Sequence, residues 1–258
     1  MLKNKITIIT GAASGIGLHI AQGYLKKNAK VILSDINEEG LQKVVAEEKS
    51  KGGDCIGIKC DVTKEDEIKN LIMQSQKNYG RIDILINNAG LQHVANIEDF
   101  PTEKFEFMIK IMLTAAFITT KYAFPIMKEQ NFGRIINMAS INGVIGFAGK
   151  SAYNSAKHGL IGLTKVTALE GALKGITANA ICPGYVDTPL VRGQMADLAK
   201  NRGVSIEQVL EEVLFPLIPQ KQLVDINDIV ELALFLSSEH AKNITGQSMI
   251  IDGGYTIQ

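Results

Sequence analysis

Three side chains of this sequence could together move a proton. Tyr153 and Lys157 are four residues apart, so on a helix they would share one face. Ser140 ends an apolar run upstream of them. Tyrosine, with a pKa of about 10, is a poor base at neutral pH, but nearby positive charges favour the phenolate. We predict that Ser140 holds a substrate oxygen and Tyr153 takes its proton, although a tyrosine and a lysine at this spacing are also common on helices without a function.

A glycine-rich turn, Thr10–Gly17, could bind a phosphate group. It follows an apolar β-branched run and opens a stretch with helical apolar spacing. Glycines let backbone N–H groups approach a pyrophosphate, and the dipole of the following helix favours negative charge. By itself such a turn can be only a turn, but its position between a strand and a helix favours a dinucleotide site. The predicted contacts in this turn are Thr10, Gly11, Ser14, Gly15, Ile16 and Gly17.

Two acidic residues follow later apolar runs. Asp35 ends the second run, where a carboxylate can accept hydrogen bonds from ribose hydroxyls and would repel a 2′-phosphate. No arginine or lysine lies between Asp35 and Leu41, so we expect NAD rather than NADP. Asp61 and Val62 close the third run, where the acid could meet the adenine amino group or cap the next helix. Both interpretations of Asp61 stay open.

The elements that must position these residues alternate along the chain. Continuous apolar strands separated by amphipathic helices predict a parallel sheet covered on both faces. Right-handed crossovers then make it a doubly wound α/β fold of the Rossmann type, with about seven strands, and residues 1–258 are expected to form one domain. The predicted strands are Lys5–Thr10, Val31–Asp35, Cys55–Lys59, Ile82–Asn87, Arg134–Ala139, Thr177–Ile181 and Ser248–Ile251. After a first helix that includes Ile16 and Ile20, the predicted helices are Asn37–Ser50, Lys64–Asn78, Thr102–Glu129, Tyr153–Leu173 and Asn227–Ser237.

One insertion, at about residues 187–222, breaks this alternation. Ser205–Gln208 is a capping-box sequence, and the apolar residues that follow have helical spacing. Helices inserted beyond a strand end, where such sheets bind ligands, predict a substrate lid. Packing or a contact between subunits is the alternative.

Composition excludes several other classes. Lysine plus arginine and aspartate plus glutamate each number 27, so a basic nucleic-acid surface is not expected. We expect no membrane span and no signal peptide, and the odd number of cysteines, 3, fits reduced thiols in a cytoplasmic protein. The four histidines are far apart and form no metal-ligand spacing with cysteine, so no metal is expected.

The order of these motifs identifies a family. The glycine turn, Asn87–Gly90, Ser140, the pair Tyr153 and Lys157, and Pro183–Gly184 follow one another as in the short-chain dehydrogenases/reductases, which the whole chain resembles. The resemblance implies hydride transfer to a nicotinamide dinucleotide, with Tyr153 and Lys157 contacting the cofactor as well as the substrate. It also implies a homotetramer with contacts at the C-terminal strand and helices. The further cofactor contacts it implies are Asn88, Ala89, Gly90, Pro183, Gly184, Val186 and Thr188.

Within that family the sequence resembles the 3-hydroxybutyrate dehydrogenases. The resemblance rests on Asn87–Val94, Gly149–Tyr153, Thr188–Gln194 and the C-terminal Asp252–Gln258. It implies NAD-dependent interconversion of D-3-hydroxybutyrate and acetoacetate, with Gln92, Lys150 and Gln194 on the carboxylate. One cation and two neutral amides suit a small anion. Taken singly, Lys150 and Gln92 could be solvated loop residues. The full predicted substrate set is Gln92, Ser140, Asn142, Lys150, Tyr153, Tyr185, Gln194 and Tyr255.

Three departures from the family pattern affect this expectation. Met112 stands where the family usually has an asparagine that supports a proton relay, so we expect a weakened relay; its apolar neighbours also allow a purely structural role. Asn142 replaces a histidine, while Tyr185 and Tyr255 replace frequent tryptophans. These changes could resize the pocket, although one methylene is worth only about 1–3 kcal/mol.

Two other functions remain open at this point. One is a sugar, polyol or 3-ketoacyl reductase of the same family, because the fold does not decide the substrate. The other is a regulatory protein that binds NAD but has lost turnover through Met112.

Overall fold

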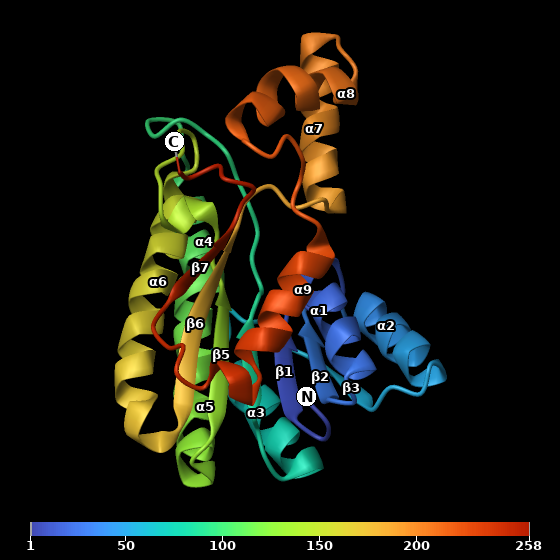
Figure 1. Ribbon diagram of the computed structural model, residues 1–258, viewed down its shortest axis with the longest axis vertical. Coiled ribbons are helices and arrows are strands. Elements are labelled where there is room, and N and C mark those ends of the chain that lie inside the picture. The colour runs from blue at the N-terminus through green and yellow to red at the C-terminus, as the bar shows by residue number, and fades with distance from the viewer. Residues whose placement is uncertain (1, 258) are drawn as a thin grey trace.

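The computed structural model describes residues 2–257, apart from the side chains of Pro189, Leu190, Gln194, Asp197, Leu198 and Asn201. Its centre is one sheet of parallel strands in the order β3-β2-β1-β4-β5-β6-β7 (Figure 1). The predicted doubly wound fold is confirmed. The strands are β1 (Ile6–Thr10), β2 (Lys30–Asp35), β3 (Cys55–Lys59), β4 (Ile84–Asn87), β5 (Gly133–Met138), β6 (Ile176–Pro183) and β7 (Ser248–Ile251).

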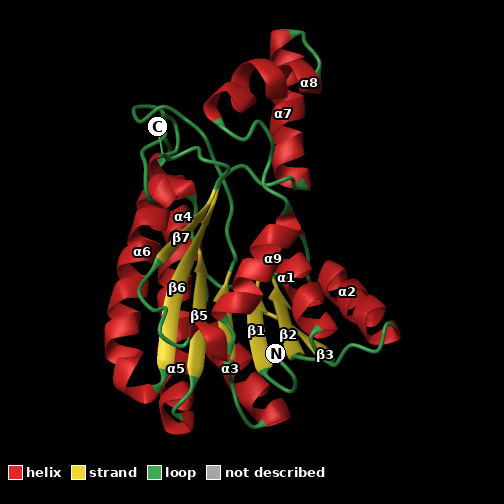
Figure 2. Ribbon diagram, viewed as in Figure 1, coloured by secondary structure: helices red, strands yellow, loops and turns green. Residues whose placement is uncertain are grey.

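Helices cover both faces of the sheet (Figure 2). The central strands alternate their apolar side chains between two cores, because successive residues of a strand point to opposite faces. One core packs β-strand residues against α1, α2 and α9, and the other against α3, α5 and α6. The helices are α1 (Gly15–Lys26), α2 (Glu38–Ser50), α3 (Glu65–Tyr79), α4 (Thr102–Ile109), α5 (Ala115–Gln130), α6 (Ser151–Gly171), α7 (Pro189–Arg202), α8 (Ile206–Val209) and α9 (Ile226–Leu236).

The predicted helix Thr102–Glu129 is not one regular α-helix. A π-helical turn, Lys110–Thr114, separates α4 from α5 and has the buried Met112 at its centre. Such turns insert one extra residue and are frequent at functional sites. Within residues 2–257, the run Thr102–Gln130 is the one helix with the length and apolar composition of a membrane span. Since 50% of its most apolar window is buried, as in a core helix, this is weak evidence for a span.

The segment between β6 and α9 forms a separate helical group. Ser205 Oγ accepts a hydrogen bond from Gln208 N, and the Gln208 side chain accepts one from Ser205 N, so the predicted capping box is confirmed. The helices α7 and α8 bury their own small cluster, which includes Met195, Val209 and Leu214. Figure 1 shows this group beyond the carboxyl ends of the strands.

The strand order fixes where ligands can bind. The direction in which strands are added to the sheet reverses between β1 and β4. The strands β2 and β3 lie on one side of β1, and β4 to β7 lie on the other. In open parallel sheets, a crevice forms outside the carboxyl ends at such a switch point. The glycine turn after β1 and the Asn87–Gly90 segment after β4 therefore meet at this crevice.

Candidate active site

The structure brings Ser140, Tyr153 and Lys157 together. Ser140 follows β5, and the other two lie on the first turns of α6. The Ser140 side chain lies close enough to Tyr153 to affect the pKa of its phenol. Lys157 Nζ donates to the Met138 carbonyl at 2.6 Å and lies 5.3 Å from the centre of the Tyr153 ring. The predicted proton-transfer group is thus assembled in space.

The acid–base properties of this group differ from the expectation for tyrosine. Burial raises the pKa of Tyr153, and the neighbouring Ser140 hydroxyl only partly opposes this. Burial lowers the pKa of Lys157 to about 8, because the charged ammonium loses its hydration. The expected lowering of the phenol pKa is therefore not supplied by the protein alone. A further positive charge beside Tyr153 would favour its phenolate form.

Ser140 is oriented by the turn that follows it. Its Oγ accepts a hydrogen bond from Asn142 N at 3.1 Å, as the cap of the short turn Ile141–Gly143. With one lone pair occupied in this way, the hydroxyl hydrogen remains available for an oxygen acceptor in the site. This agrees with a serine that donates a hydrogen bond to substrate.

The end of β4 is clamped to the glycine turn. Thr10 Oγ1 accepts hydrogen bonds from the backbone N–H groups of Asn88 (3.0 Å) and Ala89 (3.1 Å). Asn88 Nδ2 in turn donates to the carbonyls of Thr10 and Gly11, each at 3.0 Å. Four of the predicted cofactor residues, Thr10, Gly11, Asn88 and Ala89, therefore hold the shape of the turn itself. Gly90 follows directly and packs near Met112.

The glycine turn fits a dinucleotide phosphate. A Cβ at Gly17 would lie 2.3 Å from the Gly11 carbonyl oxygen, so only glycine allows this close approach. Gly15 has a left-handed backbone and open space where its Cβ would point. Ser14 and Ile16 flank it at the start of α1, and the Ser14 side chain makes no capping hydrogen bond there. First-turn N–H groups without a cap are suited to bind an anion.

The two acidic residues have defined local roles. Asp35 Oδ2 accepts a hydrogen bond from Ala13 N at 3.0 Å, which links the end of β2 to the glycine turn. Asp61 Oδ1 accepts from both the backbone and the hydroxyl of Thr63, at 3.0 and 2.7 Å. Asp61 thus shapes the turn before α3, although the cap position of that helix is Lys64. Val62 lies beside it and lines the crevice at the end of β1.

The segment after β6 turns toward the helical group. Gly184 passes so near Asp252 that a Cβ would lie 2.9 Å from the Asp252 Cα. Pro183, the last residue of β6, precedes it; Val186 pairs with Val224 in an isolated bridge. Thr188 is buried, and its Oγ1 caps α7 by accepting from Val191 N at 3.3 Å.

Lys150 is a buried cation without an acidic partner. Only 9% of the residue is exposed, and among the described residues no carboxylate lies within ion-pair distance of its Nζ. Nζ lies 4.3 Å from the centre of the Phe147 ring and 5.8 Å from that of Tyr185. Burial lowers the pKa of Lys150. A desolvated ammonium of this kind is prepared to receive an anion.

Of the other predicted substrate residues, Tyr185 contacts Lys150 directly and Tyr255 does so through Tyr185. Tyr185 and Tyr255 are in ring contact, their centres 5.8 Å apart, and burial raises the pKa of Tyr185 to about 12. Asn142 is buried, and its Nδ2 has no hydrogen-bond partner within the described part of the chain. Gln92 is partly exposed on the loop after β4. The side chain of Gln194 lies outside the described residues.

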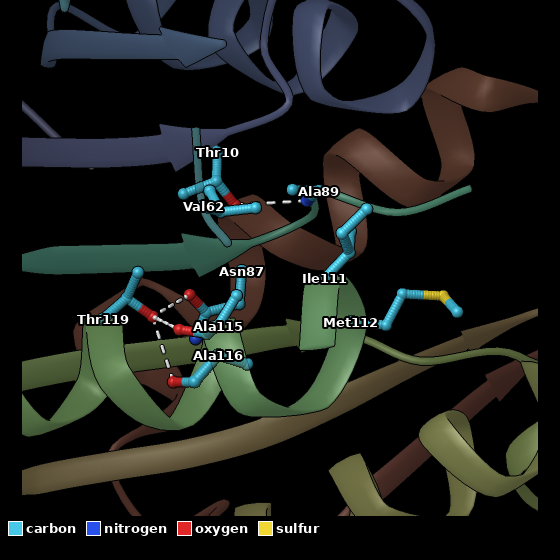
Figure 3. Close-up of a pocket in the computed structure, with 9 residues that line it drawn as sticks. All are labelled: Thr10, Val62, Asn87, Ala89, Ile111, Met112, Ala115, Ala116 and Thr119. Atoms are coloured by element: carbon cyan, nitrogen blue, oxygen red, sulfur yellow. Dashed lines mark hydrogen bonds between the residues drawn. The ribbon is translucent and has the colours of Figure 1, made fainter. Parts of the chain in front are cut away.

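A small crevice lies beside the hydrogen bonds that join Thr10 to Asn88 and Ala89 (Figure 3). Its volume is about 10 Å³, room for about one water, and it is lined by residues such as Thr10, Asn87 and Met112. Figure 3 also shows Thr119, whose hydroxyl donates to Asn87 Oδ1. The Asn87 amide continues this buried network to Asn137 at 2.9 Å. This network was not predicted from the sequence, although asparagines within apolar strands were a signal for it.

No group of three or more potential metal ligands occurs among residues 2–257 whose side chains are described. The groups that the site offers for chemistry are the hydroxyls of Ser140 and Tyr153 and the amines of Lys150 and Lys157.

Comparison with known proteins places this site in a family. A family model described as enoyl-(acyl carrier protein) reductase matches residues 11–256. The chain belongs to the short-chain dehydrogenase/reductase family. It is 57% identical to the uncharacterized oxidoreductase YxjF of Bacillus subtilis and 44% identical to D-beta-hydroxybutyrate dehydrogenase of Cupriavidus necator, each over 100% of both chains. A crystal structure of a variant actinorhodin polyketide ketoreductase with NADPH has a TM-score of 0.93 at 32% identity, covering 99% of each chain.

These findings show an oxidoreductase that uses a nicotinamide dinucleotide. The resemblance to the family that the motifs predicted is confirmed. Neither the choice between NAD and NADP nor the substrate follows from the family, because its members differ in both.

Proposed function

We propose that the protein oxidises D-3-hydroxybutyrate to acetoacetate with NAD, in a reversible reaction. The observation that carries this proposal is Lys150, a buried cation without an acidic partner among the described residues, on the segment that leads into the helix of Tyr153. Its charge suits the carboxylate of a small hydroxy acid. The similarity to D-beta-hydroxybutyrate dehydrogenase over the full length supports the same substrate.

In this proposal the protein residues bind the acid at both ends. Lys150, with Gln92 and Gln194, holds the carboxylate, and Asn142, Tyr185 and Tyr255 surround the carbon chain. Ser140 donates a hydrogen bond to the C3 oxygen.

Tyr153 accepts the proton of the C3 hydroxyl, and its phenolate form is favoured by the Lys157 ammonium. Lys157, whose Nζ also bonds the Met138 carbonyl, passes the proton on. NAD, when bound, supplies the hydride acceptor and a positive ring beside the phenol. The hydrogen on C3 leaves with both electrons of the C3–H bond as a hydride, and the hydroxyl proton goes to Tyr153. One alcohol and one NAD therefore yield one ketone, one NADH and one proton.

The preference for NAD rests on Asp35. Its carboxylate ends β2 beside the glycine turn, and neither arginine nor lysine lies in the segment up to Leu41. A 2′-phosphate there would meet negative charge without compensation. The cofactor contacts proposed are those predicted from the sequence, from Thr10 to Thr188.

Initial rates with NAD and NADP on both enantiomers of 3-hydroxybutyrate test this function, with a panel of polyols as competitors. We expect NADH formation with the D enantiomer. Tyr153→Phe should remove turnover, with NAD binding retained, because only the proton acceptor is lost. Equal rates of the Phe variant and the unchanged chain would contradict the assigned base.

A second candidate is a reductase of larger keto substrates with NADPH. The ketoreductase structure bound to NADPH, at 32% identity, favours it. Product formation with NADPH and 3-ketoacyl thioesters, and none with hydroxybutyrate, would decide for this candidate.

We further propose that the protein works as a homotetramer in the cytoplasm. Exposed apolar side chains at the C-terminal end of α6 and in the turn Ala172–Lys174 that follows it support an assembly. Leu169 is 79% exposed and Leu173, in the next turn, is 98% exposed. Exposed apolar residues that cluster on one surface commonly mark a protein contact.

A further inference from the structure

Two loops carry the residues proposed to hold the carboxylate. Gln92 lies on the loop between β4 and α4, and Lys150 ends the loop between β5 and α6. Neither loop contains a strand that could fix the distance between these side chains. The inference that follows rests on the proposed function of this site.

The two loops are joined directly by their backbones. Ala95 N donates a hydrogen bond to the carbonyl of Gly149 at 3.0 Å. Gly149 has a φ of +77°, in the left-handed region, and a Cβ there would lie 3.0 Å from Val94 Cγ1. The left-handed backbone of this contact therefore favours glycine, and any larger residue would also press on the Val94 methyl group.

Other contacts hold each loop within itself. Lys150 N donates to the Phe147 carbonyl at 3.3 Å, and the His93 ring packs edge-on against Phe100, their centres 5.2 Å apart. The outer side of the two loops borders an open hollow of about 440 Å³, lined by Val94, Ala95, Asn96, Asp99, Ala148 and Gly149. Other anchors lie further along each loop. Asn154 Nδ2 bonds the Ile145 carbonyl at 2.8 Å, and Phe100 packs edge-on against Phe105.

We infer that Val94–Ala95 and Gly149 form a positioning clip that sets the spacing of Gln92 and Lys150. Gly149 directly precedes Lys150, so displacing it moves the ammonium. With the clip closed, the cation and the amide are held ready for one carboxylate, and less freedom is lost on binding. Gly149 is thus a positioning residue for the acid end of the substrate.

Gly149→Ala tests the clip, with Gly146→Ala as its matched control. Gly146 lies in the same loop, without a left-handed φ and with open space where a Cβ would point. Strain in Gly149→Ala favours the open loop, so binding of the acid must first close it. We expect the KM for D-3-hydroxybutyrate to rise roughly five- to thirtyfold in Gly149→Ala. Gly146→Ala should match the unchanged chain.

The other kinetic constants separate positioning from a loss of structure. The kcat at saturating acid and the KM for NAD should change by less than about twofold, because the clip acts only on acid binding. Gly149→Asn should be less affected, since asparagine tolerates a left-handed backbone better than alanine. Adding Val94→Ala to Gly149→Ala should restore part of the affinity by removing the nearest methyl group.

The outcomes distinguish the clip from the function on which it rests. If the unchanged chain oxidises the acid but Gly149→Ala behaves like Gly146→Ala, the clip is wrong and the function stands. The clip is also wrong if Gly149→Ala lowers kcat and weakens NAD binding as much as it weakens acid binding. If the unchanged chain does not oxidise the acid, the proposed function and this role of Gly149 are both wrong.

Discussion

The burial of Lys150 gives acid binding a distinctive pH dependence. Its pKa lies below the ordinary lysine value of 10.5 because the ammonium is desolvated. The charged form, which attracts the carboxylate, is present below the lowered pKa and is lost as the pH rises through it. The affinity for the acid should therefore fall at the pH at which Lys150 loses its charge.

We expect the KM for 3-hydroxybutyrate to rise with pH on the alkaline side, at a lower pH than an exposed lysine would give. Lys150→Arg is the control, because arginine stays charged throughout and should flatten this rise. Lys150→Ala should raise the KM roughly ten- to a hundredfold even at neutral pH. The same alkaline rise in the Arg variant would assign it to another group.

Burial of Lys157 should cost stability below pH 8. Its pKa is about 8 in the folded chain, against an ordinary lysine value of 10.5 in the unfolded chain, so the unfolded chain binds more protons between these values. The buried charge of Lys157 therefore lowers the free energy of unfolding by its full amount below pH 8. This penalty becomes smaller as the pH rises toward 10.5. The penalty is on the order of 3 kcal/mol.

Lys157→Met should accordingly raise the free energy of unfolding at pH 7 while abolishing turnover. The measurement is denaturant unfolding of both chains at several pH values. The gain should shrink as the pH increases above 8. A gain independent of pH would show that packing of the methionine, rather than loss of the charge, explains it.

At the scale of elements, the π-helical turn between α4 and α5 places Met112 in the apolar cluster that packs against Tyr153. Met112 is 2% exposed and packs in a cluster with Met108, Ala152 and Ala156. Its thioether is at best a weak hydrogen-bond acceptor. The adjoining crevice of about 10 Å³ has room for about one water. The only hydrogen-bonding atom that the Met112 side chain offers to such a water is this sulfur.

Met112→Asn should raise turnover, by at most about tenfold, by giving a relay water an amide partner. Met112→Leu, which keeps an apolar side chain of similar size, is the control and should leave turnover unchanged. The Asn variant should also unfold more easily, since a polar group is placed in an apolar cluster. Unchanged or lower turnover of the Asn variant across the pH range would count against a weakened relay.

At the scale of the whole molecule, the exposed leucines at the C-terminal end of α6 and in the turn after it are the feature to test. If Leu169 and Leu173 lie between subunits, Leu169→Glu should lower the molar mass in solution measured by light scattering. Lys43→Glu, which introduces the same residue on the exposed side of α2, should leave the mass unchanged. A mass equal to that of the unchanged chain in the Leu169 variant would contradict this contact.

The elements could be predicted from sequence because they depend on local patterns. Cys55–Lys59 and Ser248–Ile251 were predicted to the residue, since buried strands are continuous apolar runs with clear ends. The π-helical turn was missed, because its apolar residues fit a regular helix equally well. The phenol of Tyr153 was expected to be acidified by Lys157 together with a bound nicotinamide ring; in the chain alone, burial, which local sequence does not give, raises its pKa.

The alternation of strands and helices, the glycine turn and the set of Ser140, Tyr153 and Lys157 could all be read from the chain, because each is encoded by residue types at short spacing. The folded structure was needed to show that Lys150 is buried against Phe147 and Tyr185, and that Ala95 bonds Gly149. These contacts join loops that follow different strands. They exist because the parallel sheet brings the carboxyl ends of its strands to one edge, where residues far apart in the chain become neighbours.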